Sequence, residues 1–160
     1  MQPKRRTTVT LAQSMGPTEA NVLGNVHGGI IMKLCDEAGG IAAARFAGRP
    51  AVTVAVDSMS FLSPVRIGNL LTITAVVTWV GHTSIETLVK VTAEDVLTGI
   101  ITHTNEAFFV YVALDREGKP TPVPPLLCET DGERQLYEQA VARRDLRLKL
   151  KNQSRHNHND

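Results

Sequence analysis

The stretch that decides the fold is GGIIMKLCDEAGGIAAARF, residues 28–46. Its apolar side chains recur every three or four residues, which predicts a helix. These side chains are Ile30, Ile31, Leu34, Cys35, Ala38, Ile41 and Ala42. Two glycines and a run of alanines make the second half of this helix thin, so we expect a sheet to approach it closely and wrap around it. Gly48 and Pro50 are expected to end it.

Strand-like segments flank this helix. A short β-prone stretch lies at 7–11, followed by a loop at 15–29 that is rich in Gly, Pro and Asn. After the helix come four segments of alternating polarity, at 52–61, 71–79, 85–93 and 101–114. The alternation slips at Ser58, which predicts a bulge near Asp57. Because short turns between successive strands make them antiparallel neighbours, the order of elements indicates an α+β domain whose helix fills the concave face of the sheet.

The C-terminal part is expected to add one helix. Four prolines between 120 and 125 predict an extended connector. Asp131 is a candidate cap for a basic helix that runs to about Leu150. We therefore divide the chain into a domain at 1–130, a helix at 131–151 that packs on it, and a flexible polar tail at 152–160.

The composition is that of an ordinary globular protein. The chain has 160 residues, 42% of them hydrophobic and 21% charged, with a net charge of +1, which predicts no general attraction to nucleic acid or membrane. An RNA contact through the basic C-terminal end is disfavoured because that end lacks aromatic side chains for stacking. The two cysteines form no metal or redox motif. Residues 1–6 do not resemble a signal peptide and no apolar run is long enough to span a membrane, so we expect a cytoplasmic protein.

Chemistry is expected where the loop at 24–29, GNVHGG, enters the helix. Gly28 and Gly29 leave backbone N–H groups unscreened at a helix start, where they can hold a carbonyl oxygen as it becomes negative. Asn25 adds a side-chain amide. Asp36 stands in the middle of the apolar helix, where aspartate is unfavourable, and this predicts a general base or a nucleophile.

These groups lie too far apart to act together within one chain. Eight residues separate Gly28 from Asp36, which is roughly 12 Å of helical rise. A single carbonyl cannot lie within hydrogen-bonding distance of both. If both take part in catalysis, they come from different chains, and two antiparallel helices across a two-fold axis would bring them together. The catalytic interpretation therefore requires a dimer.

The chain resembles the hotdog-fold acyl-CoA thioesterases of the cytosolic acyl-CoA hydrolase branch. The resemblance covers about residues 7–150. It is carried by the segments GNVHGG at 24–29, KLCDEAG at 33–39, VDS at 56–58, FLSPV at 61–65, GN at 68–69, GHTS at 81–84, HTN at 103–105 and PVPPL at 122–126.

This resemblance implies a single hotdog domain in which an antiparallel sheet wraps around a central long helix, with an additional C-terminal helix. It implies hydrolysis of acyl-CoA to a free fatty acid and coenzyme A, with Asn25 and Asp36 forming a composite site across a homodimer that is part of a hexamer, a trimer of dimers. No metal or other cofactor is expected. The expected substrate-binding residues are His27, Gly28, Gly29, Arg66, His82, Thr83, Ser84, Arg143 and Arg144.

The pattern also leaves alternatives. The family more often has Arg at the position of His82, which weakens a phosphate contact there or makes it depend on pH. His27 beside the glycine pair is also compatible with a hydroxyacyl-thioester dehydratase, a related hotdog class that uses a catalytic histidine. A non-catalytic acyl-CoA sensor would need neither Asn25 nor Asp36.

Overall fold

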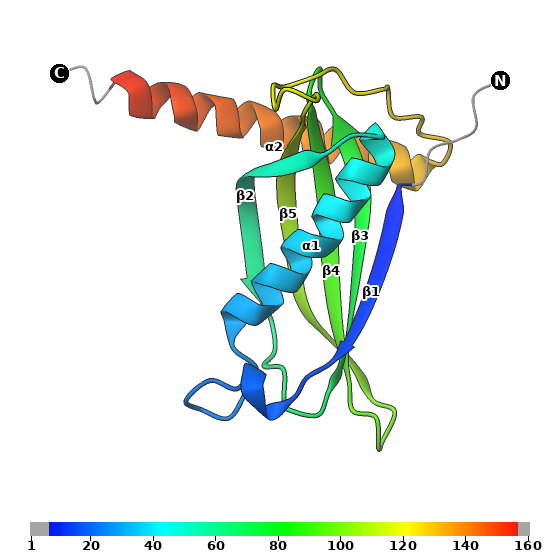
Figure 1. Cartoon of the computed structure of the whole chain (residues 1–160), viewed down its shortest axis with the longest axis vertical. Coiled ribbons are helices and arrows are strands. Elements are labelled where there is room, and N and C mark those ends of the chain that lie inside the picture. Colours follow the sequence, from blue (N-terminus) through cyan, green and yellow to red (C-terminus); the bar gives the residue numbers. More distant parts are fainter. Residues whose placement is uncertain (1–6, 157–160) are drawn as a thin grey trace.

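The computed structural model describes residues 7–156, which form one curved antiparallel sheet and two long helices (Figure 1). The strands are β1 (Thr8–Ser14), β2 (Ala51–Phe61), β3 (Leu70–Val80), β4 (Ser84–Glu94) and β5 (Ile101–Ala113). The helices are α1 (Gly28–Ala47), α2 (Asp131–His156) and the short 3-10 helix η1 (Pro17–Glu19). The predicted α+β architecture, with a sheet around a central helix and a second helix at the C-terminus, is confirmed.

The strand order in the sheet is β1-β3-β4-β5-β2. The prediction that successive strands are neighbours is correct for β3, β4 and β5. It is wrong for β2, which pairs with β5 and not with β3. The reason is that the connection at 62–69 runs from β2, at one edge of the sheet, past β5 and β4 to β3 near the other edge, so β2 is an edge strand.

Helix α1 packs closely on the concave face of the sheet, as its small residues predicted. Gly39 is buried there, and a Cβ at this position would overlap the hydroxyl of Tyr111 and lie 2.8 Å from Thr87 Oγ1. Thr87 lies on β4 and Tyr111 on β5. Only glycine at position 39 therefore lets these two strands approach the helix so closely. At its end the helix turns into the left-handed conformation at Gly48 (φ 66°), which ends it as predicted.

The edge strand β2 has the bulge predicted near Asp57, since the register shifts between Val56 and Ser58, and a second shift lies between Thr53 and Ala55. Among residues 7–156, β2 pairs with β5 along one edge and with no strand along the other. The valine side chains of β2 are exposed, with Val54 at 55%. An unpaired apolar edge of this kind is a surface suited to another strand.

Helix α2 crosses the convex face of the sheet, opposite α1 (Figure 1). The Arg143 guanidinium donates to the carboxylate of Glu86 (Nη2 to Oε1 2.8 Å, Nε to Oε2 3.1 Å) and lies 3.7 Å above the ring of Phe108. Arg147 forms an ion pair with Asp57. Burial raises the pKa of Asp57 above its ordinary value, while the cation of Arg147 opposes this shift.

Two details of the predicted C-terminal part are corrected. The helix cap is Thr130 and not Asp131: Thr130 Oγ1 accepts from the Glu133 amide, and the Glu133 carboxylate accepts from the Thr130 amide. The helix also continues to His156, so residues 152–156 are helical and not a flexible tail. The rest of that tail, and the N-terminal stretch at 1–6, lie outside the described residues. Neither long helix of the described chain has the length and apolarity needed to cross a membrane.

Candidate active site

A pocket of about 290 Å³ opens at the N-terminal end of α1. It is bounded by the loop before the helix, by the first turns of α1 and by the segment that follows β2. Its lining consists of Asn21, Asn25, Val26, Gly28, Ile31, Phe61, Leu62, Ser63, Pro64 and Val65. The apolar side chains of this wall suit an acyl chain, and the two asparagines supply polar groups at its rim.

The loop at 21–25 is held by the side chain of Asn21. Its Oδ1 accepts from the amides of Leu23 (2.9 Å) and Asn25 (3.2 Å), and its own amide donates to the Asn25 carbonyl (2.7 Å). The Asn21 side-chain oxygen is thus used within the loop, and its NH₂ group is the part available to a ligand. Asn25 also lines the pocket, and its backbone pairs with Arg66.

His27 is the N-cap of α1, because its Nδ1 accepts from the Gly29 amide (3.0 Å). This bond corrects one expectation: the Gly29 N–H is directed to His27 and is not available to a carbonyl oxygen in this structure. Among residues 7–156 the Gly28 amide has no acceptor, and Gly28 itself lines the pocket beside the Phe61 ring. Gly28 is therefore the backbone donor at this helix start that remains free.

Asp36 lies half-buried in the middle of α1, facing the edge strand β2. Thr53 Oγ1 of that strand donates to Asp36 Oδ1 (2.6 Å). The hydroxyl of Tyr111 on β5 donates to Asp36 Oδ1 (3.2 Å) and to its backbone carbonyl (3.0 Å). Burial and the neighbouring Asp36 carboxylate raise the pKa of Tyr111 well above its ordinary value, so this hydroxyl remains a donor. Among the described residues Asp36 Oδ2 accepts no hydrogen bond, which leaves it for other chemistry.

The other predicted substrate-binding residues do not gather at this pocket within one chain. Arg66 is exposed next to it. His82, Thr83 and Ser84 form the turn between β3 and β4, where the carbonyl of Thr83 accepts from the Ala113 amide. Ala113 pairs with Ala51, just past the C-terminal end of α1, so this turn lies at the opposite end of the helix.

The two predicted arginines, Arg143 and Arg144 of α2, are on the opposite face of the sheet. Arg143 has a protein partner there, the buried carboxylate of Glu86, which is 1% exposed and which also accepts from Thr78 Oγ1 (2.7 Å). Arg144 lies over the Trp79 ring, 5.6 Å from its centroid, and its Nη1 is 3.6 Å from Asp145. The structure thus gives Arg143 a function in holding α2 to the sheet.

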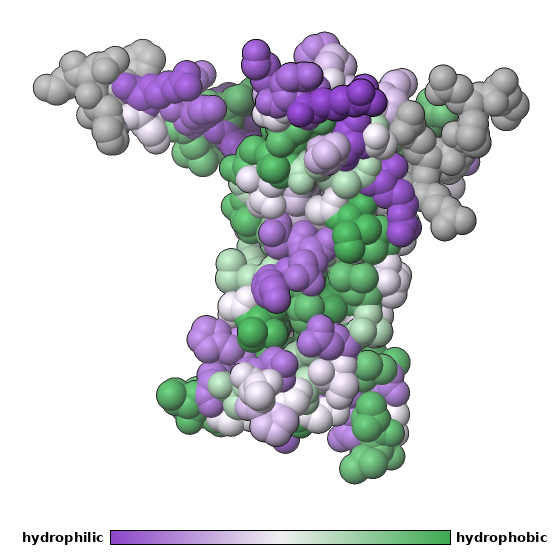
Figure 2. All heavy atoms as spheres, viewed as in Figure 1, coloured by the Kyte–Doolittle hydropathy of each residue, from purple (hydrophilic) through white to green (hydrophobic). Residues whose placement is uncertain are grey.

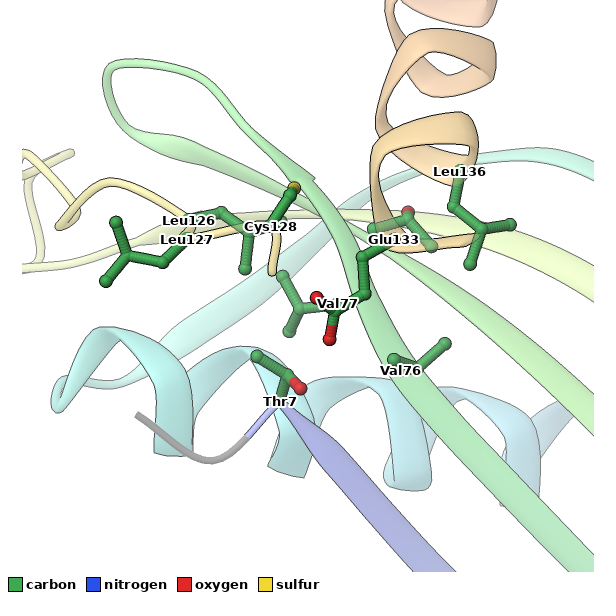
Figure 3. A pocket seen from close by; sticks show the side chains of 9 residues that line it. Thr7, Val76, Val77, Leu126, Leu127, Cys128, Glu133 and Leu136 are labelled. Atoms are coloured by element: carbon green, nitrogen blue, oxygen red, sulfur yellow. The ribbon is translucent and has the colours of Figure 1, made fainter. Parts of the chain in front are cut away.

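A second pocket, much smaller at about 30 Å³, lies between β3, the proline-rich connector and the first turn of α2 (Figure 3). The side chains of Val76, Leu126 and Leu136 line it, with Cys128 and Glu133 beside them. The Glu133 carboxylate is part of the helix cap. This volume accommodates about one water molecule and no substrate.

Sequence reasoning missed three residues around Asp36 and the pocket: Asn21, Thr53 and Tyr111. Asn21 is the first residue of the turn Asn-Val-Leu-Gly, which has glycine at its fourth position, and this pattern was a usable signal for a structured asparagine. Thr53 and Tyr111 reach Asp36 from strands that are distant in the sequence. No local pattern marks such partners.

The chain is similar to known proteins over most of its length. Residues 23–100 match the family model of the Thioesterase superfamily. Protein VdlD of Helicobacter pylori is 38% identical over 144 residues, which are 90% of this chain and 82% of that protein. The uncharacterized acyl-CoA thioester hydrolase YkhA of Bacillus subtilis is 39% identical, with 88% and 80% covered. The cytosolic acyl coenzyme A thioester hydrolase of Rattus norvegicus is 39% identical, and 91% of this chain corresponds to 40% of that longer protein.

Solved structures agree with this relationship. The acyl-CoA hydrolase of Staphylococcus aureus, in complex with butyryl coenzyme A, coenzyme A and coenzyme A disulfide, has a TM-score of 0.85 and 31% identity, covering 94% of this chain and 92% of that one. An apo-hexameric acyl-CoA thioesterase has a TM-score of 0.85 and 37% identity, covering 89% and 91%.

Three alanine variants of the S. aureus hydrolase also match, and each replaces one residue: an aspartate, an asparagine or a threonine. The three replaced positions have the same spacing in that chain as Asp36, Asn21 and Thr53 have here. With its antiparallel sheet around α1 and relatives that match it over most of their length, the chain belongs to the acyl-CoA thioester hydrolases of the thioesterase superfamily.

Proposed function

We propose that this chain hydrolyses acyl-CoA at a composite site, built from the α1 start of one subunit and the α1 middle of a second. The observation that carries the proposal is the position of Asp36. It faces the edge strand β2 through Thr53, whereas the pocket with the free Gly28 amide begins eight residues earlier in the same helix. That interval is roughly 12 Å, which is too long for one reacting carbonyl to span.

We propose that two β2 strands pair with each other to form this assembly. If the strands pair antiparallel about a two-fold axis near the bulge at Asp57, the Thr53 end of one strand lies opposite the Phe61 end of the other. Thr53 accompanies Asp36, and Phe61 lines the pocket. The same pairing uses the free backbone groups of both β2 edges and brings the exposed valines of the two strands side by side. A hexameric relative and a hexameric thioesterase of Yersinia pestis at 37% identity support assembly beyond the dimer.

In this site the thioester carbonyl lies at the pocket rim of one subunit. The Gly28 amide and the side-chain NH₂ of Asn21 donate to its oxygen as negative charge develops. Oδ2 of the second subunit's Asp36 activates a water, or attacks the carbonyl carbon directly. Thr53 and Tyr111 hold Oδ1 and so fix the direction of Oδ2. The C–S bond breaks, the CoA thiolate takes up a proton, and water supplies the hydroxyl of the free acid.

Asn25 remains the alternative amide donor, because it lines the same pocket. The spacing shared with the S. aureus variants supports Asn21. For the CoA phosphates we propose Arg66 and the turn at 82–84, which the two-fold axis would bring to the same end of the assembly. The chemistry needs no metal or other cofactor, and the name of the rat relative supports a cytoplasmic location.

The first test compares Asn21→Ala with Asn25→Ala in an assay of thiol release from acyl-CoA. Loss of a donor to the developing oxyanion costs on the order of a hundredfold in kcat. We expect this loss for Asn21→Ala and a much smaller one for Asn25→Ala. The opposite ranking would assign the donor role to Asn25.

The second test mixes two inactive proteins, Asn21→Ala and Asp36→Asn, under conditions that exchange subunits. Each mixed dimer has one site with both residues intact. Random mixing makes about half of the dimers mixed, so about a quarter of the wild-type activity returns if the site is composite. Recovery no higher than the parent variants would show that each site lies within one chain.

A further inference from the structure

Helix α2 is longer than the sheet that it crosses. It begins against β3, contacts Glu86 of β4 and Phe108 of β5 through Arg143, and reaches Asp57 of β2 through Arg147. Because β2 is the last strand on that side, the rest of the helix projects past the sheet (Figure 1). We call residues 148–156 the α2 arm.

The arm is long enough to reach across neighbouring strands. Its residues continue the helix to His156, which gives roughly 13 Å beyond Arg147 at the rise of an α-helix. Strands in a sheet lie roughly 4.8 Å apart. The arm therefore has the length to cross above two further strands if a second sheet continues from β2.

The arm also carries leucine side chains of the kind that a helix usually packs against another surface. Leu148 is 42% and Leu150 is 56% exposed, and hydrophobic atoms lie among the hydrophilic ones of the projecting segment (Figure 2). The face that packs on the sheet, with Ala140, Arg143 and Arg147, continues by steps of three and four residues to Leu150. The packing face thus extends past the sheet that it covers.

We propose that the α2 arm packs on the convex face of the second subunit, across the paired β2 strands. This inference rests on the β2-paired dimer proposed above. In that dimer the partner's β2 and β5 directly continue the sheet under the arm, and the two-fold axis makes each arm cover the other subunit.

The arm is basic, and the convex face that it would cover carries one exposed carboxylate, Glu106, which lies 3.9 Å from Lys90 and 3.8 Å from His103 of its own sheet. The arm contains Lys149, Lys151 and Arg155. Glu106 lies on β5 two residues before Phe108, so it faces the same convex side as α2, and its side chain is 39% exposed. β5 is the second strand from the seam, within reach of an arm of this length.

The test measures amide hydrogen exchange and the dissociation constant of the dimer for three proteins. These are the full chain, a truncation after Arg147, and a control truncation that removes only 157–160. We expect amides of the arm to exchange at least tenfold more slowly in the dimer than in the dissociated chain. We expect the truncation after Arg147 to raise the dissociation constant at least tenfold, whereas the control leaves it unchanged. Leu150→Glu should reproduce the larger effect, and Leu97→Glu, in the exposed turn after β4, should not.

Three outcomes would overturn the inference, and they differ in what they leave standing. If β2 amides are protected in the dimer but the arm exchanges as in the dissociated chain, the arm is free and the composite site is unaffected. If truncation leaves dimers intact and only separates them from a larger oligomer, the arm contacts another dimer. If the β2 amides are not protected, the proposed seam is wrong, and the arm proposal is wrong with it.

Discussion

Replacement of Tyr111 by phenylalanine tests whether its hydroxyl positions the carboxylate of Asp36. The side chain is 1% exposed, and its ring packs against Phe109 with centroids 6.3 Å apart. Phenylalanine preserves this packing and removes only the oxygen that lies 3.2 Å from Asp36 Oδ1 and 3.0 Å from the Asp36 carbonyl. The perturbation therefore acts on the hydrogen bonds of Asp36 and on the contact of the same oxygen with the buried hydroxyl of Thr87.

The expected magnitude follows from the geometry of these bonds. A hydrogen bond to a charged group contributes about 1.5–3 kcal/mol. Tyr111 has one proton shared between two acceptors, and Thr53 still donates to the same oxygen at 2.6 Å. We therefore take the lower end, about 1.5 kcal/mol, which corresponds to about a tenfold loss in kcat. KM should change little, because Tyr111 does not line the pocket at the start of α1.

The assay is thiol release from acyl-CoA of graded chain length, with the melting temperature measured in parallel. Tyr137→Phe on α2 is the matched control, because it makes the same chemical change in a half-buried tyrosine on a helix far from Asp36 in the sequence. If Tyr111→Phe keeps the kcat of the control, the hydroxyl does not position Asp36. A loss confined to KM or to thermal stability would likewise contradict the positioning role.

Three further results are expected. Burial raises the pKa of Cys35 to about 12, so a thiol reagent at pH 8 should modify only Cys128 in the folded protein and both cysteines in denaturant; rapid modification of two thiols in the folded state would refute this. Gly39→Ala should lower the free energy of unfolding, measured in urea, by about 1–3 kcal/mol, because the Cβ of the new alanine has no space in the packed core. Gly40→Ala is the control and should change stability less, because its Cβ would lie at an ordinary 3.5 Å from the ring of Tyr111. Since burial raises the pKa of Asp57, the folded state binds more protons than the unfolded state above about pH 4. The free energy of unfolding should then fall as pH rises toward the folded-state pKa, and Asp57→Asn should remove this slope; an unchanged slope would contradict the assignment.

The fold was predictable from the sequence where structure depends on local patterns. The helix at 28–46 and the strands after it follow from periodicity, and the bulge near Asp57 follows from a break in that periodicity. The position of β2 at the edge was not predictable, because it depends on a long-range choice between β3 and β5 as its partner. The helical continuation past Leu150 was also missed, since a polar sequence at the end of a chain does not by itself distinguish helix from coil.

The candidate site was predictable to a similar extent. Asp36 was identifiable because an aspartate inside an apolar helix is costly and requires a reason. The residues that stabilise it, Thr53 and Tyr111, lie 17 and 75 positions away and were identifiable only from the folded chain. Asn21 and Asn25 lie in one loop, and in the sequence the proximity of Asn25 to the glycine pair favoured it as the amide donor. The hydrogen bonds accepted by the Asn21 oxygen and the spacing shared with a solved relative support Asn21 in that role.

The features that stabilise the core also prepare the proposed site. Gly39 lets β5 approach α1 closely enough for the Tyr111 hydroxyl to reach Asp36, one turn of the helix earlier. Thr53 donates to the same carboxylate from β2. Within residues 7–156, β2 is the edge strand beside β5, and its outer edge is unpaired. Asp36 is therefore already oriented within a single chain, but its proposed substrate pocket belongs to another. We therefore expect activity to require assembly: dilution below the dissociation constant of the dimer should abolish turnover while the helix and the sheet of the separated chain persist.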